Sequence, residues 1–336
     1  MRRNGTSQIS KILFASATSK SFIEKDYEIL RRNFLVKRVA YSWSQKRSLW
    51  LLIPKMIKGV LWADLTYSWF GSFHAFFAVF FSRLLGKKSV VVAGGYDVSK
   101  MPEINYGLLN MRLWRLFSVL SFKLCDKILA VSQYTKKEAM QNLGMNEEKI
   151  EVVAHGFDKS EFHPKGKKED IIITIGRGVR RKGFVTFAKA ANLLLDVDFY
   201  LIGEDEKTSV EALRRINSRN LFCEGFIPQK ELIMFMQRSK VYVQISAHEG
   251  FGCALAEAML CECIPVVTAR GAIPEVVGDA GMYVPYGDAE ATADMIKRAL
   301  NNGGTKGKRA RKRIEEKFPI QEREKKLIEI IMKLQR

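Results

Sequence analysis

The sequence has few cysteines, and their spacing does not suggest a disulfide framework. The 336 residues contain five, an odd number: Cys125, Cys223, Cys253, Cys261 and Cys263. Cys261 and Cys263 are one residue apart, but no histidine or second cysteine pair supplies the remaining ligands of a zinc site. We therefore expect reduced thiols in the core of a cytosolic protein.

The sequence also lacks an apolar run long enough to cross a membrane. Arg2 and Arg3 are followed by polar residues, so we expect no signal peptide. The most apolar stretch, Phe73–Leu85, is shorter than the about 20 residues that a bilayer requires. It predicts a helix packed between a sheet and its neighbours, with a helix that dips into a membrane interface as the alternative.

Acidic residues are scarce relative to basic ones. The chain has 55 Lys and Arg against 36 Asp and Glu, a net charge of +19, and residues 1–165 hold 26 basic against 13 acidic residues. The first half should therefore be attracted to an anionic surface such as phospholipid headgroups, a nucleic acid or an acidic glycan. Composition does not choose among these partners.

We find no long internal repeat and no low-complexity segment, and the length exceeds that of an ordinary single core. Two domains of roughly 150 residues fit it better, and 47% hydrophobic residues suffice for two cores. The polar stretch Pro164–Asp170 is the best candidate linker. Strands and helices alternate on both sides of it, which predicts two α/β domains.

In the first half, apolar runs predict strands between amphipathic helices. The predicted strands are Lys11–Ala15, Phe34–Val36, Val39–Tyr41, Ser89–Ala93, Lys127–Ser132 and Glu151–Ala154, and the predicted helices are Glu24–Arg32, Ser48–Leu61, Leu108–Cys125 and Lys136–Leu143. The valine run of Ser89–Ala93 is typical of a central parallel strand. Tyr96 and Asp97 follow its carboxyl end, so Asp97 is a candidate cleft residue, or else a residue that caps the turn.

The second half repeats this rhythm. Its predicted strands are Asp170–Ile175, Phe199–Gly203, Asn220–Gly225, Val241–Ala247 and Ile264–Thr268, and its predicted helices include Phe184–Leu195, Cys253–Cys261 and Gln321–Leu334. The first strand leads into a basic loop, Gly176–Gly183, with Arg177, Arg180, Arg181 and Lys182. Arginine binds phosphate through two parallel hydrogen bonds and lysine supplies a compact charge, so this loop is either a phosphate site or a solvated loop.

The segment from His248 to Glu257 places two carboxylates, Glu249 and Glu257, around a Gly-Phe-Gly hinge. A buried strand precedes the hinge and a helix follows it. This junction points the unpaired N–H groups of the helix at a ligand beyond the strand, which favours an anion. Glu249 then lies at the carboxyl end of a strand, where open α/β sheets bind ligands. Glu257 has apolar neighbours, so it needs a partner such as sugar hydroxyls, unless it faces solvent.

Several segments of the second half, in this order, resemble the retaining glycosyltransferases of family 4, also described as glycosyl transferases group 1. They are Ile175–Arg177 with Arg181–Gly183, Asn220–Phe222 with Gly225–Pro228, Glu249–Gly252 with Leu255 and Glu257–Met259, and Pro265–Val267 with Ile273–Gly281. In the first half the likeness rests on Asp126–Ser132 and on His155–Asp158 with Phe162 and Pro164. The resemblance implies the α/β fold called GT-B, with two facing Rossmann-like domains and a C-terminal helix that returns to the N-terminal domain. The expected domains are residues 1–163, with 318–336 packed on them, and residues 164–317.

The resemblance implies a role for each residue of the motifs. Arg177 and Lys182 would hold the diphosphate of a nucleotide-sugar and neutralise the leaving group, and Glu249 would face the donor sugar. Glu257 would bind the ribose hydroxyls. The remaining donor-binding residues would be Gly250, Phe251, Gly252, Cys253 and Leu255, with the base near Phe226 and Ile227. The backbone N–H groups of Phe251, Gly252 and Cys253 would reach the phosphate or sugar hydroxyls. No metal and no other cofactor is expected.

The acceptor side departs from the family pattern. Ser16–Ser19 replaces a common glycine pair, and Gly94–Asp97 stands where many members have a histidine. We place Tyr96 and Asp97 on this side. The expected activity is transfer of a sugar from a nucleoside diphosphate to a glycan or lipid-linked acceptor, either in the cytoplasm or at the cytoplasmic face of an anionic membrane. The alternatives are a phosphorylase or an epimerase on the same fold, and a non-catalytic protein that binds an anionic surface or nucleic acid. No nucleic-acid partner is expected for the enzyme.

Overall fold

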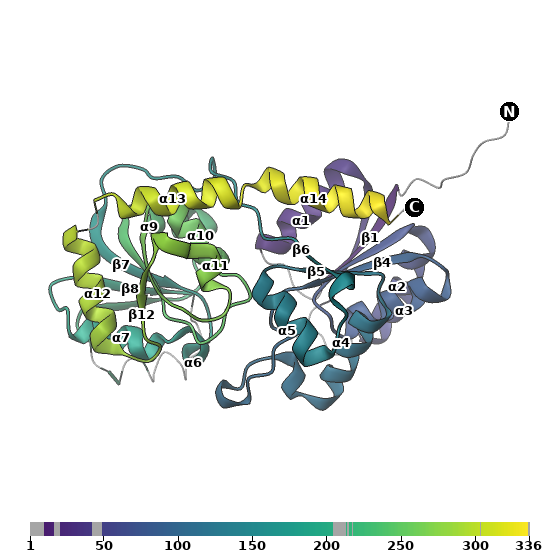
Figure 1. Cartoon of the computed structure of the whole chain (residues 1–336), viewed down its shortest axis with the longest axis horizontal. Coiled ribbons are helices and arrows are strands. Elements are labelled where there is room, and N and C mark those ends of the chain that lie inside the picture. Colours follow the sequence, from purple (N-terminus) through teal and green to yellow (C-terminus); the bar gives the residue numbers. More distant parts are fainter. Residues whose placement is uncertain are drawn as a thin grey trace. The chain divides into compact units, whose positions relative to one another are not determined.

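The computed structural model of the chain describes residues 10–16, 21–41, 49–203, 213, 215–216, 218–302 and 304–334, and for residues 49–51 and 302 it describes the backbone alone. Two compact units make up the chain (Figure 1): unit 1 is Met1–His155 with Gln321–Arg336, and unit 2 is Gly156–Ile320. The residues behind the signal-peptide prediction, and residues 17–20 of the first predicted loop, lie outside the described residues.

Unit 1 is built on a parallel six-stranded sheet with the strand order β2-β1-β3-β4-β5-β6. Its strands are β1 (Lys11–Ser16), β2 (Leu35–Ala40), β3 (Leu65–Trp69), β4 (Lys88–Ala93), β5 (Lys127–Ala130) and β6 (Ile150–Val152). Its helices are α1 (Ser21–Asn33), α2 (Leu49–Trp62), α3 (Phe73–Leu84), α4 (Arg112–Leu124) and α5 (Gln133–Leu143), joined at the end of the chain by α14 (Ile320–Lys333).

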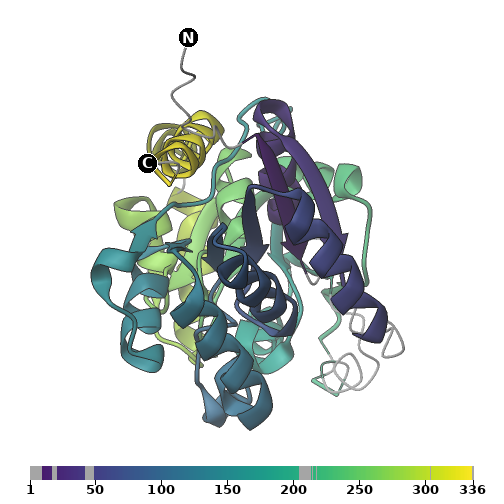
Figure 2. The same cartoon turned by 90° about the vertical axis from the view of Figure 1, so that its right-hand side faces the viewer.

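Helices cover both faces of this sheet, as the alternation of side chains along β3 shows. Thr66 points to one face, where its hydroxyl hydrogen-bonds Ser82 of α3 at 2.7 Å. Tyr67 and Trp69 point to the other and donate to Asp26 of α1 at 2.7 and 2.9 Å. Buried residues of α2, α3, α4 and α5 form the core of the first face. These helices are blue to teal in Figure 2.

Unit 2 also has a parallel six-stranded sheet, with the strand order β12-β11-β10-β7-β8-β9. Its strands are β7 (Glu169–Ile175), β8 (Asp198–Ile202), β9 (Leu221–Glu224), β10 (Ser239–Gln244), β11 (Ile264–Thr268) and β12 (Met282–Val284). Its helices are α6 (Val179–Lys182), α7 (Phe184–Asn192), α9 (Gln229–Arg238), α10 (Cys253–Leu260), α11 (Ile273–Val277), α12 (Ala289–Asn302) and α13 (Lys306–Lys317).

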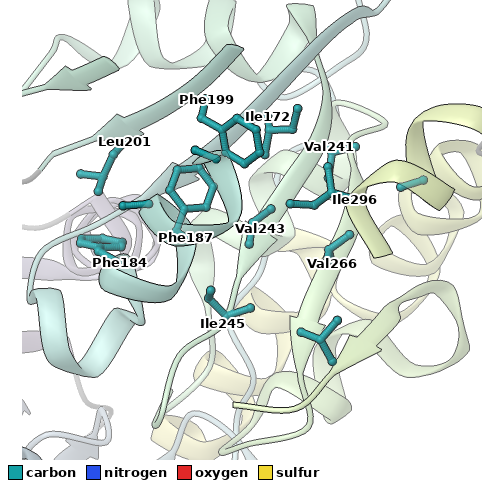
Figure 3. Packing of buried hydrophobic residues seen from close by; sticks show 14 of the residues in the cluster. Ile172, Phe184, Phe187, Phe199, Leu201, Val241, Val243, Ile245, Val266 and Ile296 are labelled. Atoms are coloured by element: carbon teal, nitrogen blue, oxygen red, sulfur yellow. The ribbon is translucent and has the colours of Figure 1, made fainter. Parts of the chain in front are cut away.

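The core of unit 2 lies between its sheet and helices α7 and α12 (Figure 3). Phe184 and Phe187 of α7 and Ile296 of α12 are fully buried against alternate side chains of β7, β8, β10 and β11. The rings of Phe187 and Phe199 meet edge to face with centroids 5.2 Å apart. This packing anchors the strands whose carboxyl ends carry the predicted site.

The strand order of unit 2 reverses direction between β7 and β10. From β7 the chain continues outward to β8 and β9, then returns across the sheet to β10 and proceeds the other way to β11 and β12. The loops that leave neighbouring strands at such a switch point diverge to opposite faces, which opens a crevice at the carboxyl edge. Both loops that the sequence singles out, after β7 and after β10, begin at this point.

The last helix packs on unit 1, as the resemblance implies. Arg323 of α14 donates to both carboxylate oxygens of Asp26 at 2.6 and 2.7 Å. Arg32 of α1 donates to Glu324 at 2.9 Å. Figure 1 shows α14 beside α1. The predicted α/β fold with two parallel sheets and a returning C-terminal helix is therefore confirmed.

Local predictions were less accurate than the overall class. The two strands predicted at Phe34–Val36 and Val39–Tyr41 are one strand, β2. The helix predicted at Leu108–Cys125 is a short 3-10 turn followed by α4 from Arg112, because Met111 is extended with φ −103°. The predicted basic loop contains a helical turn, α6. None of the five cysteines, all of them among the described residues, forms a disulfide, although Cys223 and Cys253 are half-buried rather than core residues. In the described part of the chain, no helix is long and apolar enough to cross a membrane.

Candidate active site

The loops after β7 and β10 pack backbone against backbone at the switch point of unit 2. The N–H of Ala247 donates to the carbonyl of Arg181 at 2.7 Å. Gly183, between α6 and α7, has φ +71°, and a Cβ there would lie 2.3 Å from the carbonyl oxygen of Ile245. Only glycine permits this close approach. The basic loop is therefore held in place against the segment that leads to Glu249.

This packing brings Glu249 together with two cations of the basic loop. Its Oε1 atom accepts a hydrogen bond from Lys182 Nζ at 2.7 Å and one from Arg181 Nη1 at 2.8 Å. Arg181 Nη1 also donates to the carbonyl of His248 at 3.1 Å. The pairing of Glu249 with Arg181 was not predicted, because the sequence shows only that both lie near strand ends.

The ionisation of the Glu249–Lys182 pair reflects its burial. Burial by itself raises the pKa of Glu249, but the charges of Lys182 and Arg181 outweigh it and bring the pKa down to about 2. Burial lowers the pKa of the Lys182 ammonium, and the Glu249 charge offsets part of this effect. Glu249 is consequently an ionised carboxylate throughout the neutral pH range.

Helix α10 begins at the hinge, where Gly250 and Gly252 are buried and Cys253 is half-buried. Its N-cap, Gly252, has φ +104°, a left-handed conformation that favours glycine. The ring of Phe251 turns into the protein, with centroids 5.9 Å from Phe157 and 5.2 Å from Phe318. Leu255 is fully buried. Phe251 and Leu255 therefore fix the position of the helix terminus, and only the backbone N–H groups of this segment remain as predicted ligand donors.

Glu257, one turn into α10, is 8% exposed, so the alternative of a solvent-facing carboxylate is wrong. Tyr242 of β10 lies near both glutamates: burial first, and then the charges of Glu249 and Glu257, raise the pKa of its hydroxyl. The role of Glu257 in binding ribose stays a prediction.

Gln244, the last residue of β10, is a polar residue that the sequence analysis missed. Its Oε1 accepts from the Tyr242 hydroxyl at 3.0 Å. Its Nε2 is buried, has no hydrogen-bond partner in the described residues, and lies 3.4 Å from where a Cβ on Gly252 would be. The sequence does not indicate that the side chain of Gln244, in a buried strand, lies close to the start of α10.

The other predicted donor residues follow the same edge of the sheet outward. Arg177 is exposed, and its Nε donates to the carbonyl of Gly203, just after β8, at 3.3 Å. Phe226 is exposed and Ile227 half-buried in the segment after β9. Residues after β10, β7, β8 and β9 thus occur in spatial order along one edge, the arrangement that an extended ligand requires.

In unit 1, Asp97 is fully buried and accepts hydrogen bonds from the backbone N–H groups of Gly71, Gly94 and Gly95 at 2.8, 3.0 and 3.1 Å. Burial raises the pKa of Asp97 to about 7, although the three N–H groups act to lower it. Asp97 therefore has the turn-capping role that the sequence left as the alternative to a cleft residue. Tyr96 is exposed and stays a candidate for acceptor contact.

Within the described ranges, no group of three or more His, Cys, Asp and Glu side chains is arranged to hold a metal ion. Arg177, Arg181 and Lys182 are cations at the carboxyl edge of unit 2.

Two family models match the chain and together span nearly all of it. The model described as Glycosyltransferase Family 4 matches residues 12–161, and the model described as Glycosyl transferases group 1 matches residues 157–317. The first model covers the N-terminal part, where the motifs were fewer, and the second covers the loops at the switch point of unit 2.

Individual proteins agree with these models. The alpha-maltose-1-phosphate synthase of Mycolicibacterium smegmatis is 24% identical over 244 residues, 64% of this chain and 59% of that protein. The O-antigen chain mannosyltransferase RfbU of Salmonella typhimurium is 24% identical over 190 residues, 55% of this chain and 54% of that protein. The matches thus span only a little more than half of these two relatives. The crystal structure of Anabaena Alr3699/HepE in complex with UDP and glucose superposes with a TM-score of 0.79 and 18% identity, covering 96% of this chain and 100% of that one. The chain therefore belongs to the glycosyltransferases of the family 4 type, which have the GT-B fold.

Proposed function

We propose that the protein transfers a sugar from a nucleoside diphosphate sugar to a glycan or lipid-linked acceptor, with retention of configuration at the anomeric carbon. One observation carries the donor side of this proposal. Lys182 and Arg181 meet Glu249 at the switch point of the unit 2 sheet, beside the N-terminus of α10. The structure of HepE, a protein of the same fold, contains UDP and glucose, which supports a nucleotide-sugar as donor. Retention rests on family membership.

Lys182 is the group that we assign to the leaving diphosphate. An ammonium has three N–H donors, and the contact with Glu249 uses one of them. The other two can donate to phosphate oxygens. Arg177, exposed on the same edge, is the second cation that we assign, and the N–H groups at the start of α10 add the positive end of the helix dipole. Together these groups neutralise a diphosphate without requiring a metal.

The proposed reaction breaks the bond between the anomeric carbon and the β-phosphate oxygen. The nucleoside diphosphate leaves with the electron pair, and an acceptor hydroxyl forms the new bond and gives its proton to an oxygen of the leaving β-phosphate. Positive charge develops on the sugar ring as the bond breaks. Glu249, ionised because Lys182 and Arg181 hold its pKa at about 2, is suited to stabilise this charge and not to donate a proton. It also orients Lys182 before the donor binds.

The nucleoside would lie along the remaining residues of the edge. We assign the ribose hydroxyls to Glu257, a buried carboxylate of α10 on the segment that also carries Glu249, from the resemblance to the family. We assign the base to the segment after β9, where Phe226 offers an exposed aromatic ring. An aromatic face binds a planar base by stacking.

The test is a thermal-shift screen of the purified full chain against a panel of nucleoside diphosphate sugars. A ligand that binds only the native state stabilises it, by about 2.7 kcal/mol at a hundred times its dissociation constant. The donor so identified is then incubated with candidate acceptors, and release of nucleoside diphosphate is followed together with the glycosylated product. Lys182→Ala should abolish the shift with the donor. Lys189→Ala, an exposed lysine on α7 of the same unit, is the matched control and should leave it unchanged.

Two results would contradict the proposal. One is the absence of stabilisation by every nucleotide-sugar while the protein is folded by circular dichroism. The other is formation of a sugar 1-phosphate from inorganic phosphate, or interconversion of the donor without an acceptor, which would indicate a phosphorylase or an epimerase.

A further inference from the structure

Helices α3 and α4 of unit 1 expose a group of large apolar side chains, which we call the α3–α4 patch. Its residues, with their exposed fractions, are Phe80 (37%), Leu84 (66%), Leu85 (45%), Met111 (48%), Leu113 (59%) and Leu116 (53%). Single exposed leucines are ordinary on a protein surface, whereas six large apolar residues on two adjacent helices indicate an interaction site.

Aromatic rings connect the exposed residues of the two helices. On α3, the ring of Phe80 stacks on that of Phe76 with centroids 5.7 Å apart. The ring of Phe76 lies 5.5 Å from that of Phe117, which belongs to the same helix as Leu113 and Leu116. The exposed residues of α3 and α4 are therefore joined through packed side chains. Phe73, Phe77 and Phe117 fill the space between the helices with edge-to-face and tilted ring contacts, which makes the patch rigid.

The charged side chains of α3 and α4 all have one sign. Arg83 lies in the last turn of α3, and Arg112 and Arg115 alternate with the exposed apolar residues of α4. All three are exposed, and they form no ion pair within the part of the chain that the structure describes. Neither helix contains an acidic residue. A surface that binds this patch must accept apolar side chains and supply negative charge next to them.

We propose that the α3–α4 patch docks unit 1 on an anionic phospholipid leaflet. The combination of apolar and basic side chains fits a phospholipid leaflet. Leucine, methionine and phenylalanine enter the boundary between headgroups and acyl chains, while the flanking arginines reach lipid phosphates. The inference goes beyond the proposed function and does not depend on the donor. It places the enzyme where a lipid-linked acceptor is accessible, and it assigns part of the excess positive charge of the first half to a defined surface.

The experiment is sedimentation of the full-length protein with vesicles of phosphatidylcholine alone and of phosphatidylcholine mixed with phosphatidylglycerol. The protein should bind the mixed vesicles, and added salt should weaken this binding. Leu113→Gln/Leu116→Gln should lower the partition coefficient by about tenfold or more, because two apolar side chains no longer enter the bilayer. Arg112→Gln/Arg115→Gln should lower it by roughly fivefold for each charge removed.

The matched control is Leu193→Gln/Leu195→Gln in unit 2, which removes two leucines that are 53% and 57% exposed and lie far from α3 and α4 in the sequence. It should bind vesicles like the wild type. The thermal unfolding transition of each variant without ligand shows that it is folded. The donor-induced shift, measured separately, distinguishes failure of docking from failure of the proposed function.

Three results would overturn the docking proposal. The first is a wild-type protein that binds neither kind of vesicle. The second is equal loss of binding in the control and in the Leu113→Gln/Leu116→Gln variant. The third is a wild-type dimer in size-exclusion chromatography that Leu113→Gln/Leu116→Gln converts to a monomer, which would show that a second copy of the chain covers the patch.

Discussion

The ammonium of Lys182 and the carboxylate of Glu249 lie 2.7 Å apart, although one belongs to the loop after β7 and the other to the loop after β10. Both side chains are only 10% exposed. The contact forms because β7 and β10 are neighbours in the sheet despite the two strands and the helices between them in the sequence. It links a cation assigned to the leaving group with a carboxylate assigned to the reacting sugar.

Glu249→Gln should reduce turnover on the order of a hundredfold or more, because the transition state loses a preorganised charge and Lys182 loses its orienting partner. The measurement is the initial rate of nucleoside diphosphate release at saturating donor. Glu290→Gln, at an exposed position on α12, is the control and should retain wild-type turnover. Equal rates in both variants would remove Glu249 from the catalytic residues.

Glu249 should also make the stability of the protein depend on acid pH. Its pKa is about 2 in the folded protein and about 4.3 in an unfolded chain. The unfolded state therefore binds the proton more readily, and a stabilisation of ~3 kcal/mol, complete above the unfolded pKa, is lost as the pH falls toward 2. Urea unfolding at about pH 5 and about pH 3 measures roughly half of this loss. Glu249→Gln should flatten the profile in this window, and an unchanged profile would show that other carboxylates dominate.

Some elements of the fold are determined by their local composition, and others are not. Strand β4 was predicted because a run of valines is typical of a buried parallel strand. Helix α10 was predicted because Ala, Leu and Met favour a helix. Strand β12, three residues at a sheet edge, was not predicted, because Met-Tyr-Val has no periodicity to detect. The pairing of Arg181 with Glu249 was missed for a different reason. The sequence does not show which of the four cations in the loop reach the carboxylate. The backbone contact between Ala247 and Arg181 fixes the loop so that Arg181 and Lys182 do.

Glu257→Ala should weaken nucleotide-sugar binding by about ten- to a hundredfold, the cost of one or two hydrogen bonds to a charged group, while the protein stays folded. Calorimetric titration with the donor measures the affinity. The comparison with the nucleoside diphosphate in which deoxyribose replaces ribose adds a specific control. The wild type should bind the deoxy form more weakly, and the variant should bind both forms equally. Unchanged donor affinity in Glu257→Ala would contradict the assigned role.

Asp97 should make the stability of the protein depend on pH in the direction opposite to that of Glu249. Its pKa is raised to about 7 in the folded protein, against about 3.9 in an unfolded chain, so the native state holds the proton more tightly. Stability should therefore fall as the pH rises from about 4 to about 7, by on the order of 3–4 kcal/mol. Asp97→Asn should remove this slope. The amide should also lower stability at all pH values, because its Nδ2 cannot accept the N–H of Gly71.

The control for Asp97 is Asp126→Asn, which removes a carboxylate that accepts the backbone N–H of Ser89 at 2.8 Å in the same unit but is partly exposed. It should keep the wild-type slope between about pH 4 and pH 7. A slope that persists in Asp97→Asn would show that groups other than Asp97 cause it. A wild type without the slope would mean that the three N–H groups around this carboxylate outweigh its burial.

The returning helix illustrates the limit of sequence patterns at long range. The apolar residues of α14 predict an amphipathic helix, and Leu327, Ile330 and Ile331 are buried as expected. Arg323, one turn earlier, looks like a residue of the solvated face. It is buried because Asp26 lies opposite, 297 positions away in the sequence. Nothing in the neighbourhood of either residue signals this pair.

Arg323→Met should destabilise unit 1 by about 3–5 kcal/mol, because it leaves the carboxylate of Asp26 buried without its charge partner. The Tyr67 and Trp69 donors would remain on that carboxylate, but two neutral hydrogen bonds do not replace a guanidinium that also donates to the carbonyls of Val153 and Ala154. Urea unfolding of the full chain measures the loss. Lys325→Met, at an exposed position on the same helix, should change stability by less than about 0.5 kcal/mol.

The double variant Asp26→Asn/Arg323→Met separates two causes of the lower stability of Arg323→Met. One is the loss of the charge partner of Asp26, and the other is the loss of the remaining contacts of Arg323. Asparagine keeps an acceptor for Tyr67 and Trp69 and carries no charge, so the double variant should be more stable than Arg323→Met alone. If the two variants are equally unstable, the loss comes from the packing and backbone contacts of the arginine. The ion pair itself would then contribute nothing measurable to holding α14 on unit 1.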